Sequence, residues 1–140
     1  MSLVKRGLVW LFAPPQSPIH GWRVVAWWEL RRIPFNLLMG AYGVVCLAIF
    51  YWAILTSGRL EPGDDPVEPL ALMAAPFAVN AFYTLGWLVE LPARCLWPSI
   101  SPQFGPWLLR LGLGFSLLLI TVPAAFWGGV GVLQLFRVLH

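Results

Sequence analysis

The chain alternates between long apolar stretches and short segments that hold its charged residues. Three stretches contain no Asp, Glu, Lys or Arg, over residues 33–58, 69–89 and 111–136. Because an α-helix rises about 1.5 Å per residue, each stretch is long enough to cross a hydrocarbon core of about 30 Å. The pattern predicts an all-α polytopic membrane protein with three transmembrane helices, over about 34–57, 69–91 and 107–136.

The segment before the first predicted span mixes apolar and basic residues. Residues 2–13 surround Lys5 and Arg6 with apolar side chains, and residues 17–32 intersperse tryptophan with arginine. Both patterns are typical of amphipathic helices that lie in the headgroup layer. We therefore predict a single membrane domain over 1–140, in which residues 1–32 form a cytoplasmic interfacial segment.

Composition supports the same class of protein. Of the 140 residues 59% are hydrophobic and only 11% are charged, whereas soluble domains carry about 25% charged residues. The net charge of +3 could suggest nucleic acid, but the basic residues flank the apolar stretches and do not cluster. The lipid bilayer is the expected partner, and no nucleic acid is expected.

The distribution of basic residues predicts how the chain is oriented. Seven lie on the side of the N-terminus and of the loop between the second and third spans, and two lie on the other side. The positive-inside rule then places the N-terminus in the cytoplasm and the C-terminus outside. The seven are Lys5, Arg6, Arg23, Arg31, Arg32, Arg94 and Arg110, and the two are Arg59 and Arg137.

A cluster of tryptophan and arginine immediately precedes the first predicted span. Helical spacing places Trp27 one turn from Arg31 and Trp28 one turn from Arg32, which predicts two cation–π contacts. With Glu29, these residues are interpreted as an interfacial anchor that contains a local ion pair. A ligand or partner site is the alternative interpretation.

Glu29 is the unusual member of this cluster. On a helical wheel it projects onto an otherwise apolar face, where an unpaired carboxylate would be costly. We expect it to point into the helix bundle and to pair with an arginine. The candidates are Arg32 on the same helix, or Arg94 or Arg110 across the loop.

Residues 27–36 follow the pattern Trp-Trp-Glu-x-Arg-Arg-x-x-Phe-Asn. This string resembles the opening of small uncharacterised bacterial inner-membrane proteins, in which a Trp/Glu/Arg cluster precedes an aromatic–Asn pair and an apolar helix. Pro34 departs from that pattern. The resemblance covers this string alone; it implies a bacterial cytoplasmic (inner) membrane and confers no activity.

A polar stripe runs along the second predicted span. Such groups at membrane depth normally face the bundle interior or a water-filled cavity. Glu90 and Arg94 have the i,i+4 spacing of an ion pair, although Pro92 lies between them. We favour a stripe that holds helices together; the alternative is a polar pathway or pocket. The stripe consists of Asn80, Tyr83, Thr84, Glu90 and Arg94.

Small residues recur in the third predicted span at the spacing small-x-x-x-small. Gly112 precedes Ser116 in this way, and two such pairs end at Gly128 and Gly129. Small residues let helix backbones approach closely in lipid. Because they fall on more than one face, we predict contacts within the bundle and with another subunit.

Residues that could perform chemistry are few. The two histidines, His20 and His140, are predicted on opposite sides of the membrane, and the two cysteines fit no zinc spacing. No catalytic motif occurs, so no enzyme activity, cofactor or metal is expected, and the acidic residues within 59–68 are interpreted as a tether. The predicted function is an integral membrane protein that acts through helix–helix contacts, as an accessory subunit or a homo-oligomer. The alternative is a transporter or channel component with a polar path along the second span.

Overall fold

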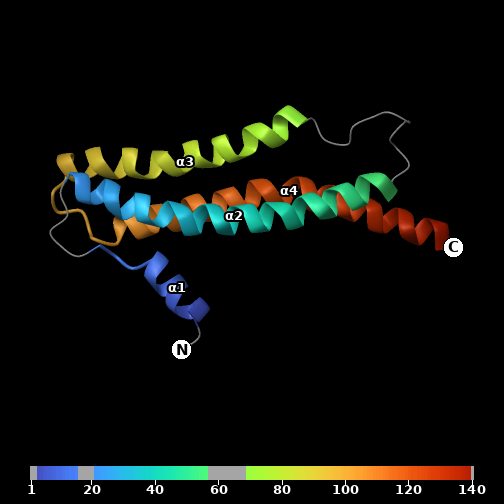
Figure 1. The fold of residues 1–140 in the computed structure, drawn as a ribbon, viewed down its shortest axis with the longest axis horizontal. Helices are drawn as coiled ribbons and strands as arrows, with labels where there is room; N and C mark the ends of the chain where they lie inside the picture. Colours follow the sequence, from blue (N-terminus) through green and yellow to red (C-terminus); the bar gives the residue numbers. More distant parts are fainter. Residues whose placement is uncertain (1–2, 16–20, 57–68, 140) are drawn as a thin grey trace. The chain divides into compact units, whose positions relative to one another are not determined.

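The structure, a computed structural model, describes residues 3–15, 21–56 and 69–139. These residues form helices and connecting segments, with no strand among them. The helices are α1 (Leu3–Leu11), α2 (Trp22–Thr56), α3 (Pro69–Leu96) and α4 (Phe104–Leu139) (Figure 1). The predicted all-α class is therefore confirmed.

The start of α2 differs from the predicted boundary of the first span. We expected an interfacial helix over 17–32 and a span beginning at 34, but one helix begins at Trp22 and continues through Pro34. Gly21 has a φ of +54°, and its carbonyl accepts a hydrogen bond from Val24 N at 3.1 Å, so the chain turns into the helix there. Residues 17–20 lie outside the described part of the chain.

Prolines do not end the long helices. Proline removes one backbone hydrogen bond and clashes with the preceding turn, and the second span was predicted to end at about residue 91, just before Pro92. Instead α3 continues to Leu96. Buried side chains lie near both sites, Phe35 next to Pro34 and Glu90 two residues before Pro92, which indicates that packing offsets the lost backbone bonds.

The described chain divides into two compact units. Unit 1 comprises Met1–Leu37 and Ala78–Phe115, and unit 2 comprises Leu38–Phe77 and Ser116–His140. Each of the three long helices contributes one part to each unit. The two units are described separately below.

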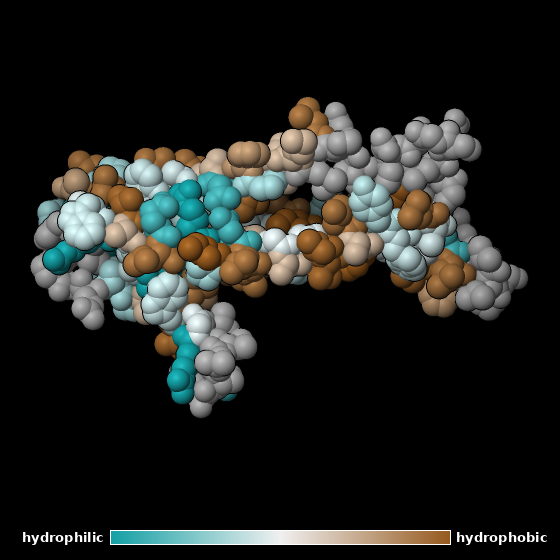
Figure 2. Space-filling model, in the orientation of Figure 1, coloured by the Kyte–Doolittle hydropathy of each residue, from teal (hydrophilic) through white to brown (hydrophobic). Residues whose placement is uncertain are grey.

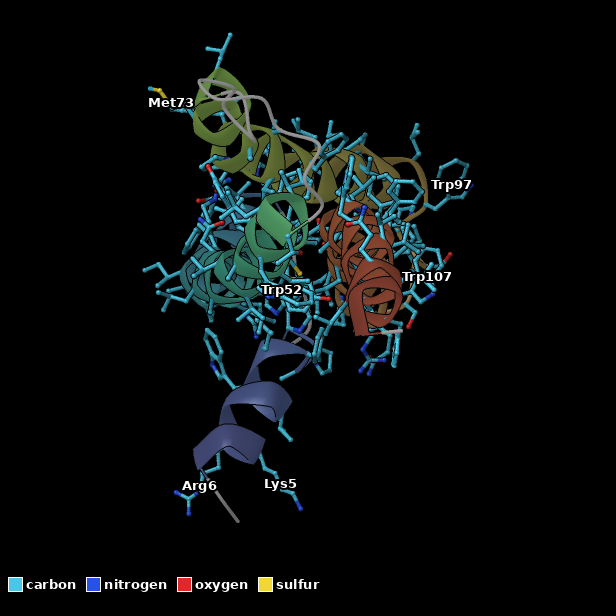
Figure 3. All side chains as sticks on the ribbon, turned by 90° about the vertical axis from the view of Figure 1, so that its right-hand side faces the viewer. Lys5, Arg6, Trp52, Met73, Trp97 and Trp107 are labelled. Carbon is cyan, nitrogen blue, oxygen red and sulfur yellow. The ribbon has the colours of Figure 1, made fainter. Side chains whose placement is uncertain are left out.

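In unit 1, the first part of α2 packs against the last part of α3 and the first part of α4. An aromatic cluster forms its core: the ring of Tyr83 lies 5.3 Å from that of Trp28 and 4.7 Å from that of Phe35. Val24 and Leu109 are also buried. α1 is joined to this unit at Trp10 and Leu11 near its C-terminal end, and Lys5 and Arg6 lie toward its other end, away from the other helices (Figures 1 and 3).

In unit 2, α2 packs against α4. The hydroxyl groups of Tyr42 and Thr121 lie 2.6 Å apart, and Ala53 is fully buried. A Cβ added to Gly131 would lie 3.1 Å from Ala53 Cα, so the two helix backbones are in close contact. The aromatic rings of Phe50 and Trp127 add an edge contact at 6.3 Å.

Two of the described helices are long and apolar enough to cross a membrane, whereas the sequence predicted three spans. These are α2 and, in α4, Phe104–Phe136, and α3 is not among them. Only 22% of the apolar window of α2 and 17% of that of α4 is buried. Most of their apolar side chains therefore point outward.

Candidate functional site

In unit 1, side chains on α2 form hydrogen bonds to side chains on α3, and we call this set the polar seam. It lies where the first part of α2 faces α3, and Figure 2 shows hydrophilic surface there amid more apolar surface. The contacts run in antiparallel order, because later residues of α2 meet earlier residues of α3. The polar seam consists of Trp28, Arg32 and Asn36 of α2 and Asn80, Tyr83, Thr84 and Glu90 of α3.

Glu90 is the most deeply buried charged group of the polar seam, with a side chain 1% exposed. Its Oε2 accepts a hydrogen bond from Trp28 Nε1 at 2.6 Å, and its Oε1 accepts one from Arg94 Nε at 2.7 Å. Arg94 Nη2 lies 2.6 Å from the same Oε1. The predicted Glu90–Arg94 pair is therefore confirmed, and the burial of this carboxylate is compensated by a cation and an indole N–H.

Two glycines make room for these side chains. A Cβ added to Gly105 would lie 2.6 Å from Glu90 Oε2, and a Cβ on Gly86 would overlap the Trp28 ring. The close approach therefore requires glycine at both positions. Sequence reasoning missed both, although Gly86 lies four residues before Glu90 and so belongs to the same helix face.

Tyr83 fixes the start of α2 against α3. Its hydroxyl donates a hydrogen bond of 2.5 Å to the Trp28 carbonyl, and its ring packs against the Trp28 ring edge to face. Both side chains are buried. Trp28 is thus held by its ring, its indole N–H and its backbone carbonyl.

Arg32 and Glu29 lie at the more open side of the polar seam. Arg32 Nη2 donates to Glu29 Oε1 at 2.8 Å and to Thr84 Oγ1 at 3.0 Å. Of the expected pairings of Glu29, the one with Arg32 on the same helix is confirmed. However, the Glu29 side chain is 43% exposed and does not point into the bundle. The predicted contact between Arg32 and Trp28 was wrong, because Arg32 lies over the Tyr83 ring, 5.3 Å from its centroid.

Amide and hydroxyl groups continue the polar seam along the helices. Asn36 Nδ2 donates to Asn80 Oδ1 at 3.0 Å. Thr84 Oγ1 donates to the Asn80 carbonyl at 2.8 Å and so remains free to accept from Arg32. These short polar side chains thus join two helices without carrying net charge.

Arg31 holds the C-terminal end of α1. Its guanidinium donates to the carbonyls of Leu11 at 2.9 Å and Trp10 at 3.0 Å, and to that of Trp27 at 3.1 Å. It lies between two rings, 4.1 Å from the Trp27 centroid and 4.6 Å from that of Trp10. The predicted Trp27–Arg31 contact is confirmed, and Arg31 satisfies carbonyls that a helix end leaves free.

The placement of the predicted anchor differs from the expectation. Trp27, Trp28 and Arg31 are buried within the protein, and only Glu29 and Arg32 of the cluster reach the surface. The reason is that the buried members find hydrogen-bond and ring partners in unit 1 itself. Sequence periodicity could not reveal these partners, because Trp28 and Glu90 are 62 residues apart.

Among the described residues, no three His, Cys, Asp or Glu side chains approach closely enough to hold a metal ion. Both histidines and the acidic segment 59–68 lie outside the described residues. No protein family, curated protein or solved structure compared with the chain matches it. The geometry is therefore the basis for a function, and in it the most buried carboxylate, Glu90, takes part in contacts that hold helices together.

Proposed function

We propose that the chain is an integral membrane protein whose α2, α3 and α4 contain three spans, over about 34–57, 69–91 and 107–136. The small buried fractions of the apolar windows in α2 and α4 support this, because a core helix of a soluble protein is mostly buried. Apolar side chains that point outward are stable in contact with lipid chains. Residues 69–89 carry no charge, so α3 fits the same medium.

The proposed location is the bacterial cytoplasmic membrane, with the N-terminus in the cytoplasm and the C-terminus outside. The resemblance of residues 27–36 and the excess of basic residues on the N-terminal side support it. On this topology unit 1 lies at the cytoplasmic side. α1 then lies in the headgroup layer, with exposed Lys5 and Arg6 toward lipid phosphates.

Within the membrane, the protein acts through helix–helix contacts, as an accessory subunit of a larger complex or as a homo-oligomer. The observation that carries this proposal is the closure of the Glu90 carboxylate by Trp28, Arg94 and Gly105. An ionisable residue in a span is usually a candidate for transport or catalysis. Here every contact that it makes joins or stiffens helices.

A transport path along α3 has less support. Such a path would need Asn80, Tyr83, Thr84 and Glu90 to face water. Tyr83 and Glu90 are buried, and each is held by a hydrogen bond to Trp28. Moving a proton or substrate past Glu90 would require these bonds and the Arg94 pair to open.

Unpacked glycines favour contact with another chain. A Cβ added to Gly40, Gly43, Gly112 or Gly129 would meet nothing within 4 Å. Small residues on apolar helix surfaces allow close approach of a second helix in lipid. These positions are available for a partner because this chain does not use them.

Purification in mild detergent from the native membrane, followed by mass determination and identification of co-purifying proteins, tests the proposal. We expect either several copies of this chain or a distinct membrane protein in constant proportion. Replacing Gly129 with Leu should weaken assembly, whereas Gly131→Leu should act on the chain itself. Recovery of the intact chain alone as a monomer would contradict both forms of the proposal.

A further inference from the structure

Three exposed tryptophans gather at one end of unit 1. Trp22 begins α2, Trp97 follows the end of α3 and Trp107 lies in the first turn of α4, and their exposed fractions are 73%, 61% and 55%. These helix ends lie together, because Glu90 near the end of α3 contacts Trp28 near the start of α2 and abuts Gly105 at the start of α4. Trp97 projects clear of the helices in Figure 3.

Arginines accompany these tryptophans. Arg23 is adjacent to Trp22, Arg110 lies one turn after Trp107, and both are exposed. The Arg110 guanidinium lies over the Phe12 ring, 5.2 Å from its centroid. Among the described residues neither arginine has an ion pair, because the two carboxylates of unit 1, Glu29 and Glu90, pair with other arginines.

We propose that this surface, the Trp/Arg belt, binds the headgroups of anionic phospholipids. It consists of Trp22, Arg23, Trp97, Trp107 and Arg110. Indole rings favour the boundary between hydrocarbon and water, where the ring is in apolar surroundings and its N–H reaches polar groups. Guanidinium groups bind phosphate oxygens with paired hydrogen bonds. The inference rests on the proposed membrane location and adds the lipid class that the protein selects.

The Trp/Arg belt takes the place of the anchor predicted over residues 27–32. Trp27, Trp28 and Arg31 are occupied inside unit 1, so they cannot serve lipid headgroups without unfolding it. The belt residues have the opposite property. All five are exposed, and the two arginines have no ion-pair partner among the described residues. They border outward apolar side chains such as Leu96 and Leu111. This combination matches a negatively charged headgroup above an acyl chain.

The test uses the full chain reconstituted into phosphatidylcholine vesicles that contain either spin-labelled phosphatidylglycerol or spin-labelled phosphatidylcholine. The ratio of their association constants is measured from the motionally restricted signal. We expect the wild-type chain to prefer phosphatidylglycerol and the variant R23Q/R110Q to have a weaker preference, reduced by up to about fivefold per arginine. R137Q is the control, because it removes one positive charge from the other end of α4, and losses are compared per charge removed. Circular dichroism must show unchanged helicity in both.

Several results would overturn the proposal. One is an inserted wild-type chain that associates equally with both lipids, and another is a preference that is undiminished in R23Q/R110Q. A loss per removed charge in R137Q equal to that in R23Q/R110Q would show a general effect of net charge. Loss of self-association in R23Q/R110Q with unchanged lipid preference would assign the belt to a second copy. A chain that restricts no lipid at all would instead refute the membrane location, which separates the two failures.

Discussion

The two carboxylates of the described chain lie in opposite surroundings. The Glu29 side chain is exposed and pairs with Arg32, whereas Glu90 is enclosed by Trp28 and Arg94. Exposed ion pairs contribute about 0–1 kcal/mol, because water solvates both charges well and forming the pair costs the two side chains conformational freedom. A buried cation left without its partner has no such compensation. The similar sequence spacing of the two pairs therefore conceals a large difference in energy.

Replacing Glu90 with Ala should lower the free energy of unfolding by about 3–5 kcal/mol, because it leaves Arg94 and the Trp28 indole N–H buried without their acceptor. Replacing Glu29 with Ala should cost less than about 1 kcal/mol. Unfolding of the two variants in mixed micelles by increasing denaturing detergent checks this difference. Equal losses would show that the enclosure of Glu90 does not govern its contribution.

Gly105 offers a smaller and more selective change at the same place. In Gly105→Ala the new methyl group would lie 2.6 Å from Glu90 Oε2, and Glu90 is held on its other sides. We expect a loss of about 1–3 kcal/mol, typical of overpacking. Gly112→Ala in the same helix meets nothing within 4 Å and should be neutral or gain about 0.5–1 kcal/mol. Both are measured by the same unfolding experiment, and a loss for Gly112→Ala equal to that for Gly105→Ala would contradict the packing.

At the scale of elements, α1 depends on one side chain of another helix. Arg31 donates to the carbonyls of Trp10 and Leu11 and lies between the rings of Trp10 and Trp27. A helix as short as α1 is marginal by itself in water. Its position in unit 1 therefore follows from Arg31 and from the burial of Leu11.

Replacing Arg31 with Gln should release α1 while α2 to α4 remain helical. The expected observation is faster amide hydrogen exchange over residues 3–11, because the carbonyls at the end of α1 lose their donor. Arg6→Gln, which removes an exposed arginine of α1 itself, is the control and should leave exchange there nearly unchanged. Unaltered exchange over 3–11 in the Arg31 variant would show that α1 is held by other contacts.

The small residues of α4 divide into two classes that the sequence does not distinguish. A Cβ on Gly131 would lie 3.1 Å from the backbone of Ala53, whereas a Cβ on Gly129 would meet nothing within 4 Å. Gly131→Leu should therefore lower the free energy of unfolding by about 1–3 kcal/mol. Gly129→Leu should leave stability nearly unchanged and alter only the mass of the assembly, measured by light scattering in detergent. A loss of stability in Gly129→Leu but not in Gly131→Leu would contradict this assignment of Gly131 to packing within the chain and of Gly129 to assembly.

At the scale of the whole molecule, the sequence predicted features that depend on neighbouring residues. The charge-free stretches located the long helices, and the i,i+4 spacing predicted the Glu90–Arg94 pair and the Trp27–Arg31 contact. Contacts between distant segments were not predictable in this way. The partner of Trp28 depends on how α2 meets α3, and a helical wheel contains no such information.

The same limit explains the misplaced anchor and helix boundaries. Tryptophan and arginine beside an apolar stretch are typical of a membrane interface, but here tertiary partners bury three of the five residues concerned. Proline lowers the stability of a helix locally, and packing of nearby residues such as Phe35 and Glu90 overrides that preference. Gly86 and Gly105 were missed because each is needed only for the side chain that packs against it, Trp28 or Glu90, and the sequence does not show that contact.

We propose that the chain crosses a membrane three times with unit 1 on the cytoplasmic side. The most direct measurement places a compartment-sensitive reporter at each end of the full chain and compares their activities in intact bacteria. We expect a cytoplasmic signal from the N-terminal reporter and an external signal from the C-terminal reporter, with all of the protein in the membrane fraction. Signals from the same compartment, or a protein that disperses in buffer without detergent, would contradict it.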